Sequence, residues 1–365
     1  MLVRRISMKK VIALVLSMSL LLLAACDKSA NGAESQTAPA QPSGQASAPA
    51  DTSKDSSESY SFRLATHYAT SHPGYAALER IAADLNEQSG GKIEVKLYPS
   101  SQLGDYTLTY EDLMRGSVDF ALIPIPSEYD PKLEMNFVPY MVTDYSQMES
   151  AYGPDSYFYK EYGGIHENLG VKLLGLYVEG LIGFGLTQLP DSYADPAASK
   201  GLMIRCPAIE VYNLVTEDMG YSATTIPYAD LYSALQTGVV DGWIGGTPQL
   251  NYTDFKDVIK YYVDYNVFAE NIGFFMSLDV FNSLPAEYQT MIQDAFMKEA
   301  INSYAVAEQL DNEALSKMEE YGIEIVRLTD EQRAAYAKSI QEKTWPRLYK
   351  NIGEETLKKL VEAVQ

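Results

Sequence analysis

The histidines are the first residues to consider for chemistry, because His67 and His72 lie five positions apart. They could give two ligands to a zinc ion, but neither a nearby cysteine nor a His-Glu-x-x-His frame accompanies them. The chain lacks a phosphate-binding loop, a dinucleotide-binding glycine pattern and a Gly-x-Ser-x-Gly nucleophile elbow. Its 49 acidic residues are too many for any pair to stand out as an acid–base couple. The sequence therefore predicts a protein that is not an enzyme and has no cofactor or metal.

Strands and helices alternate along the chain from about residue 60. Apolar residues recur at helical spacing from Tyr75 to Leu85 and stop before Gly90, which predicts a helix after a first strand. A helical stretch of about thirty residues follows Pro285, and one that long could cross two lobes. The pattern predicts an α/β fold with two lobes. The expected strands are 62–68, 92–98, 118–123, 171–177, 201–205, 239–243 and 272–278, and the expected shorter helices are 75–85, 110–115, 209–219 and 229–237.

Length and charge exclude several classes of protein. The 365 residues exceed what one ordinary core needs, and 46% of them are hydrophobic, so two packed domains are expected. The formal net charge of −21 would repel nucleic acids and anionic lipid headgroups. The same field would slow an anionic ligand, so an acid would need local positive charge to bind.

The first 26 residues look like an export signal that ends in a lipoprotein cleavage site. Basic residues precede an apolar run from Val11 to Ala25, which is shorter than a transmembrane helix needs. The run leads directly into Cys26, so we expect cleavage before this residue and its lipidation; the alternative is an ordinary secretory peptide with an incidental cysteine. Residues 27–59 contain no aromatic or branched aliphatic residue and predict a flexible linker. Cys206 would then be the only free thiol, a small buried hydrophobe.

Two segments carry a resemblance to a known family. They are Gly201-Leu-Met-Ile-Arg-Cys-Pro207 and Tyr232-Ser-Ala-Leu-Gln-Thr-Gly-Val-Val-Asp-Gly242, and further agreement lies at Gly90-Gly-Lys-Ile93 and Leu284-Pro285. Over roughly residues 60–340 the chain resembles the DctP-type solute-binding proteins of tripartite ATP-independent periplasmic (TRAP) transporters. The resemblance implies a two-lobed, periplasmic-binding-protein-like fold with a hinge, whose lobes close on a ligand that a membrane permease then receives.

The resemblance also implies that Arg205 binds the ligand's carboxylate. A guanidinium offers two parallel N–H donors to a carboxylate, and such charge-assisted hydrogen bonds are about twice as strong as neutral ones. The alternative is a salt bridge at a strand end. Many relatives carry a second arginine where this chain has Ile182, and an asparagine where it has Gly245. A second ligand carboxylate facing Ile182 would be buried unpaired, so we expect a monocarboxylate with an apolar or aromatic part.

Other ligand contacts are expected near the strand ends. Trp243 could stack on the ligand, or it could be an ordinary core tryptophan. Glu179 could neutralise an amine on the ligand, or it could be a solvated loop charge. The remaining candidates, of which some are expected to be structural, are Thr66, His67, Tyr68 and Tyr177.

Together these observations predict an extracytoplasmic, lipid-anchored solute-binding protein that delivers a small organic acid to TRAP permease subunits and binds no nucleic acid. A ligand-loaded receptor that feeds a sensor kinase is the alternative, and a lipoprotein hydrolase is a remote third. The predicted organisation is a signal peptide at 1–25, the lipidated cysteine and linker at 26–59, lobe I at 60–181 plus about 271–310, and lobe II at 182–270 plus about 311–365.

Overall fold

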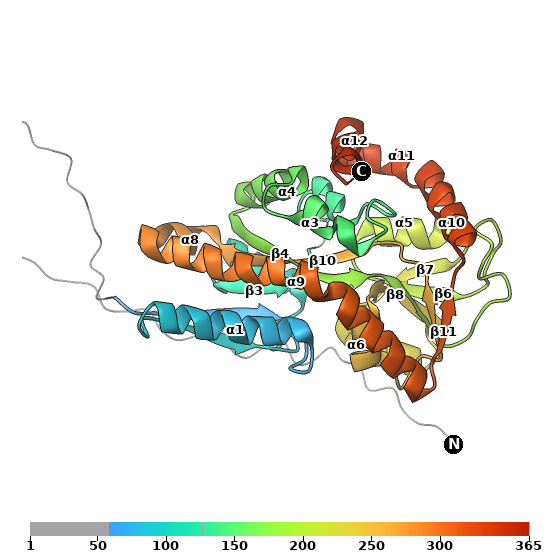
Figure 1. Ribbon diagram of the computed structural model, residues 1–365, viewed down its shortest axis with the longest axis horizontal. Coiled ribbons are helices and arrows are strands. Elements are labelled where there is room, and N and C mark those ends of the chain that lie inside the picture. The colour runs from blue at the N-terminus through green and yellow to red at the C-terminus, as the bar shows by residue number, and fades with distance from the viewer. Residues whose placement is uncertain (1–57, 126, 365) are drawn as a thin grey trace, which may run out of the picture. The chain divides into compact units, whose positions relative to one another are not determined.

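The computed structural model describes residues 58–125 and 127–364, which lie within one compact unit (Figure 1). The predicted signal peptide, Cys26 and nearly all of the linker lie outside the described residues. Within them, no helix is both long and apolar enough to cross a membrane.

The first sheet has five strands in the order β2-β1-β3-β10-β4. Strands β1, β2 and β3 are parallel, whereas β10 is antiparallel to both β3 and β4. Strands β3, β10 and β4 are almost wholly buried, because helices cover the sheet on both faces. Their bounds are β1 Tyr60–Thr66, β2 Ile93–Tyr98, β3 Phe120–Ile123, β4 Val171–Leu181 and β10 Ala269–Ser277.

The second sheet has six strands in the order β11-β9-β5-β8-β6-β7. Strands β6, β7 and β8 are parallel, and β5 is antiparallel to β8 and β9. Their bounds are β5 Gly183–Leu186, β6 Met203–Cys206, β7 Ser222–Thr225, β8 Gly242–Gly246, β9 Tyr261–Asp264 and β11 Glu324–Arg327. The predicted strand 239–243 begins three residues later than expected, because Gly238 and the exposed Val239 form the turn that follows a helix.

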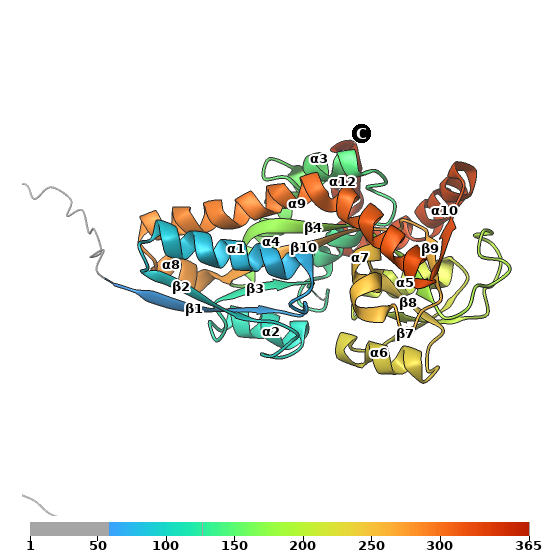
Figure 2. The same cartoon turned by 60° about the horizontal axis from the view of Figure 1, so that its bottom comes forward.

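Two short crossings join the sheets. Strand β4 continues into β5 through Ile182, and β9 leads into β10 through residues 265–268. The crossings are hydrogen-bonded to each other: the Ile182 N–H donates to the Phe268 carbonyl at 2.8 Å, and the Val267 N–H donates to the Ile182 carbonyl at 2.9 Å. The 36-residue helix α9, Ala286–Tyr321, contacts β4 and α1 as well as β11 (Figure 2). The predicted two-lobed α/β fold with a long spanning helix is confirmed.

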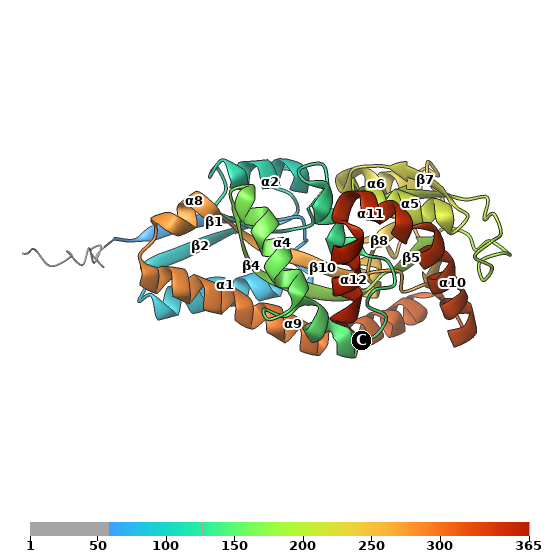
Figure 3. The ribbon, with the colours of Figure 1, turned by 90° about the horizontal axis from the view of Figure 1, so that it is seen from above.

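The remaining helices cover the two sheets. Helix α1 begins at Pro73, where the His72 Nδ1 accepts the Gly74 N–H at 3.1 Å and so caps the helix. The C-terminal helices contact elements beside both sheets: α10 contacts α5, α11 contacts η1 and α12 contacts α4 (Figure 3). Their bounds are α1 Pro73–Gln88, α2 Tyr106–Met114, η1 Pro131–Phe137, η2 Tyr145–Gln147, α3 Met148–Tyr152, α4 Tyr157–Asn168, α5 Glu210–Asp218, α6 Tyr228–Gln236, α7 Pro248–Leu250, η3 Asn251–Phe255, α8 Leu278–Ser283, α10 Asp330–Lys343, α11 Trp345–Ile352 and α12 Glu354–Glu362.

Gly180, just before the first crossing, is required by its surroundings. It has a φ of 148°, and a Cβ at this position would overlap the carboxylate of Asp311 on α9. That carboxylate accepts hydrogen bonds from the Leu181 N–H at 3.1 Å and from the Tyr145 hydroxyl at 2.6 Å. The glycine therefore lets α9 bond directly to the crossing strand.

We expect Gly180→Ala to lower the free energy of unfolding by about 1–3 kcal/mol, because the methyl group strains the backbone and displaces Asp311. Chemical denaturation would measure this loss. Gly164→Ala on α4 is the matched control, since its Cβ would have no heavy atom within 4 Å, and it should not destabilise the protein. Equal stability of the two variants would contradict the role given to Gly180.

Candidate functional site

One cavity is lined by residues from both sheets, and we call it the Arg205 cavity. His67 and Pro124 follow the carboxyl ends of β1 and β3, while Arg205 and Gly245 lie near those of β6 and β8. The cavity volume that can hold the centre of a water molecule is only about 30 Å³. An organic acid could therefore enter only if the walls part. The complete lining is His67, Tyr106, Pro124, Glu179, Arg205, Pro207, Ile209, Tyr212, Tyr228, Gly245, Leu250, Glu270 and Ile272.

The positive charge in this cavity comes from Arg205, which is only 2% exposed. Its Nε donates to the Ile226 carbonyl at 2.8 Å, and the Tyr228 ring lies 5.9 Å from its Cζ. Among the described residues, neither Nη nitrogen makes an ion pair or hydrogen bond with a side chain or carbonyl. Burial lowers the pKa of Arg205, although an arginine stays charged. A buried guanidinium with two unused donor nitrogens favours an incoming carboxylate.

Two carboxyl groups share the cavity with Arg205. Glu179 on β4 and Glu270 on β10 are each 6% exposed. Burial raises the pKa of Glu270 to about 8. Burial, followed by the neighbouring Glu270, raises the pKa of Glu179. The Glu270 Oε2 accepts the Tyr212 hydroxyl hydrogen at 3.1 Å.

His67 and His72 are neutral at physiological pH. Burial, and for His67 the charge of Arg205, lowers the pKa of both imidazoles to about 3. His67 lines the Arg205 cavity, whereas His72 caps α1 and its Nε2 lies 3.6 Å from Glu179 Oε2. Within the described residues, no group of three or more histidine, cysteine, aspartate or glutamate side chains could hold a metal ion.

The structure brings four of the sequence-predicted site residues together in the cavity lining: Arg205, His67, Glu179 and Gly245. Gly245 has a φ of 119°, and a Cβ there would lie 3.8 Å from the Arg205 Nη1. The glycine thus leaves open the space beside the guanidinium where an asparagine would stand. Glu179 is not the solvated loop charge of the alternative reading, because it is buried within β4.

Trp243 does not line the cavity. Its side chain is fully buried against Phe255 at a ring distance of 4.6 Å, and its Nε1 donates to Asn251 Oδ1 at 3.0 Å. Trp243 and Gly245 are two residues apart on β8, but Gly246 and Asn251 hold the indole in the core of the second sheet. In this conformation Trp243 packs as a core tryptophan, and its contact with the ligand stays a prediction.

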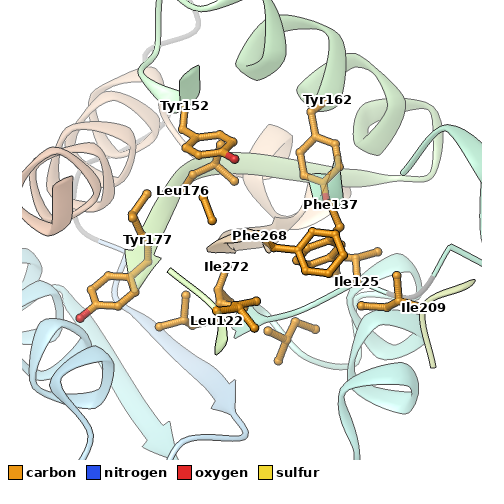
Figure 4. Close-up of a cluster of buried hydrophobic side chains, with 14 of the residues drawn as sticks. Leu122, Ile125, Phe137, Tyr152, Tyr162, Leu176, Tyr177, Ile209, Phe268 and Ile272 are labelled. Atoms are coloured by element: carbon orange, nitrogen blue, oxygen red, sulfur yellow. The ribbon is translucent and has the colours of Figure 1, made fainter. Parts of the chain in front are cut away.

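Three other candidates also lie outside the lining. The Thr66 hydroxyl donates to the Leu122 carbonyl at 2.9 Å, which ties β1 to β3. The Tyr68 ring stacks on His72 with centroids 3.9 Å apart. The Tyr177 ring packs against Phe274 and extends away from Ile272 and Phe268 (Figure 4). In this conformation all three side chains pack outside the cavity, and their contact with the ligand stays a prediction.

Ile182, which stands where many relatives are expected to have a second arginine, is also absent from the lining. It is fully buried at the crossing between the sheets. In this structure Ile182 therefore does not border the space in which Arg205 would meet the ligand. Sequence reasoning missed other lining residues, chiefly Glu270 and the tyrosines Tyr106, Tyr212 and Tyr228. Beside them, the apolar lining residues Ile209 and Ile272 belong to the buried cluster shown in Figure 4.

Comparison with known proteins decides the family. The family model described as bacterial extracellular solute-binding protein, family 7 (DctP) matches residues 64–351. The chain belongs to this family. Family 7 is a family of periplasmic solute-binding proteins rather than of enzymes, and the predicted DctP-type resemblance is confirmed.

Individual members of family 7 are distant in sequence and close in fold. A TRAP periplasmic solute-binding protein from Desulfovibrio salexigens, solved with bound orotic acid, is 25% identical with a TM-score of 0.76, covering 84% of this chain and 98% of that one. The C4-dicarboxylate-binding periplasmic protein DctP of Rhodobacter capsulatus is 24% identical over 293 residues, 78% of this chain and 84% of the relative. A solute-binding protein of Chromohalobacter salexigens is 27% identical over 199 residues, 53% of this chain and 56% of the relative, so the match spans about half of that relative.

Proposed function

We propose that this chain is the extracytoplasmic solute-binding lipoprotein of a TRAP-type secondary transporter. It captures a small organic acid between its two lobes and delivers it to the membrane permease subunits, while a lipid on Cys26 tethers it to the membrane. The single observation that carries the proposal is Arg205, whose buried guanidinium has two donor nitrogens free for a carboxylate. Bound orotic acid in the Desulfovibrio protein supports an acid as the ligand class.

The ligand is a monocarboxylate. Arg205 is the only arginine or lysine in the cavity lining among the described residues, whereas two glutamates stand in the same lining. A second carboxylate on the ligand would meet Glu179 or Glu270 without a cation to pair with, and burying an unpaired charge is costly. Ile209, Ile272 and the tyrosine rings favour an apolar or aromatic body.

Thermal denaturation against a library of monocarboxylates, dicarboxylates, amino acids and neutral sugars would test this proposal. A ligand at a hundred times its dissociation constant stabilises by about 2.7 kcal/mol, which moves the midpoint by several degrees. We expect shifts with monocarboxylates that bear a branched or aromatic group. Shifts confined to neutral sugars would contradict the role of Arg205, and shifts confined to dicarboxylates would contradict the monocarboxylate.

A further inference from the structure

The Arg205 cavity holds two buried carboxyl groups that have no role in binding a ligand carboxylate. Glu179 and Glu270 come from adjacent antiparallel strands, β4 and β10. Glu270 pairs with Gly180 and Asn271 pairs with Val178, so Glu179 is the extra residue of a β-bulge. A bulge bends its strand and redirects a side chain. At this bulge Glu179 lies in the same cavity lining as Glu270.

The hydrogen-bonding capacity of this pair is largely unused. Glu179 makes no hydrogen bond among the described residues, and its buried Oε2 has only the His72 Nε2 nearby, at 3.6 Å, which also lacks a partner. Glu270 accepts one hydrogen bond, from Tyr212. Two ionised carboxylates can accept about eight hydrogen bonds between them, and buried carboxylates are normally satisfied by donors or by a cation. The pair therefore lacks a donor that carries positive charge.

We propose that the captured acid is a zwitterion: its carboxylate pairs with Arg205, and a protonated amine with at least one N–H lies between Glu179 and Glu270. This inference rests on the proposed function and names the ligand class for the same cavity. An ammonium group supplies both the charge and the donors that the two glutamates lack. If the two glutamates share one proton, their combined charge is −1. This charge balances the +1 of Arg205, and the zwitterion adds none, so no net charge is buried.

Matched pairs of ligands that differ only by the amine would test this class. Suitable pairs are leucine with 4-methylpentanoate, phenylalanine with 3-phenylpropanoate, and 4-aminobutanoate with butanoate, each titrated calorimetrically into the purified protein at pH 7. We expect the amine-bearing member of at least one pair to bind at least tenfold more tightly. Equal or tighter binding of the amine-free member in every pair would overturn the zwitterion while leaving carboxylate capture intact. Failure of every carboxylate, together with a shift by neutral sugars, would instead overturn the proposed function.

Glutamine variants separate a ligand role from a structural one. E179Q/E270Q keeps the shape of both side chains and removes their charge. It should weaken binding of the amine-bearing ligand at least tenfold and leave the amine-free partner bound as tightly or more tightly. Glu134→Gln is the matched control, because Glu134 is a glutamate with 1% exposure that bonds Asn351 outside the cavity, and it should alter neither affinity. Equal losses for both ligands in E179Q/E270Q would indicate a structural pair.

The proton balance gives an independent readout. Burial raises the pKa of both glutamates, and that of Glu270 to about 8, so at pH 7 the ligand-free pair holds at least one proton. A bound ammonium favours the ionised form, so a zwitterion should release protons and bind more tightly as the pH rises from 6 to 8, whereas an amine-free acid should bind more weakly. The titratable and charged groups that line the cavity with the pair or interact electrostatically with it are His67, His72, Tyr106, Tyr152, Arg205, Tyr212, Tyr228, Asp254 and Asp311. Burial also raises the pKa of Asp311 to about 8, so this group could contribute to the pH effect. Only the part of the effect that E179Q/E270Q abolishes therefore supports the proposal. A pH effect that is unchanged in E179Q/E270Q would count against it.

Discussion

Arg205→Ala should weaken binding of the carboxylate ligand by more than tenfold. The side chain contributes the only guanidinium in the cavity lining among the described residues, and its two Nη nitrogens are free to donate to both carboxylate oxygens. A hydrogen bond to a charged group contributes about 1.5–3 kcal/mol, and a bidentate pair contributes two. Calorimetric titration of wild type and variant with the best ligand from the thermal screen would measure the loss.

The fold of this variant should survive. Within the described residues Arg205 makes no ion pair with a carboxylate. Its removal therefore leaves no buried carboxylate without its cation. Arg205→Met, which keeps much of the side-chain volume against Tyr228, should have a ligand-free melting temperature close to that of wild type and the same loss of affinity. Arg63→Ala is the control, because Arg63 pairs with Asp119 at the surface, at 3.7 Å. Wild-type affinity in Arg205→Ala/Trp243→Ala would rule out this cavity as the binding site.

The fold was predictable where periodicity and end signals agree. The long helix was expected because Pro285 precedes a sustained helical pattern, and the structure has it at Ala286–Tyr321. Strands β5, β7, β9 and β11 of the second sheet escaped prediction. Strand β5 contains two glycines among four residues, and β7 is Ser-Ala-Thr-Thr, so neither shows an apolar alternation that would identify it. Only their pairing with β8, β9 and β6 makes them strands.

The site was predictable where a residue lies in or beside a family segment or at a strand end. Arg205 lies in such a segment, Gly245 follows one by three residues, and both line the cavity. Glu270 lies 91 positions after Glu179 in the chain and joins it through antiparallel pairing, which no local pattern encodes. One signal was present: Glu270 is the only charged residue in the otherwise apolar or uncharged strand Ala269–Ser277. A lone charge in a buried strand is unusual enough to mark a candidate functional residue.

Trp243→Ala should produce the largest loss of stability among the substitutions considered. The indole is fully buried, packs against Phe255 and donates to Asn251. Removing a buried tryptophan side chain costs about 3–5 kcal/mol, because a cavity remains. The loss also leaves Asn251 Oδ1 without the donor it has now, although the Asn251 Nδ2 keeps its bonds to the Gly246 and Thr247 carbonyls. Denaturation of the ligand-free protein would measure the effect.

The Trp243 variants also decide between a core and a ligand-binding role for this residue. Trp243→Phe keeps a ring against Phe255 but loses the N–H, so it should be destabilised less than Trp243→Ala. At temperatures where it is fully folded, Trp243→Phe should bind the ligand within tenfold of wild type, because the indole is absent from the cavity lining. A stability near that of wild type combined with a large loss of affinity would show that Trp243 contacts the ligand directly. That result would require the second lobe to rearrange when ligand binds, since Gly246 and Asn251 now hold the indole in its core.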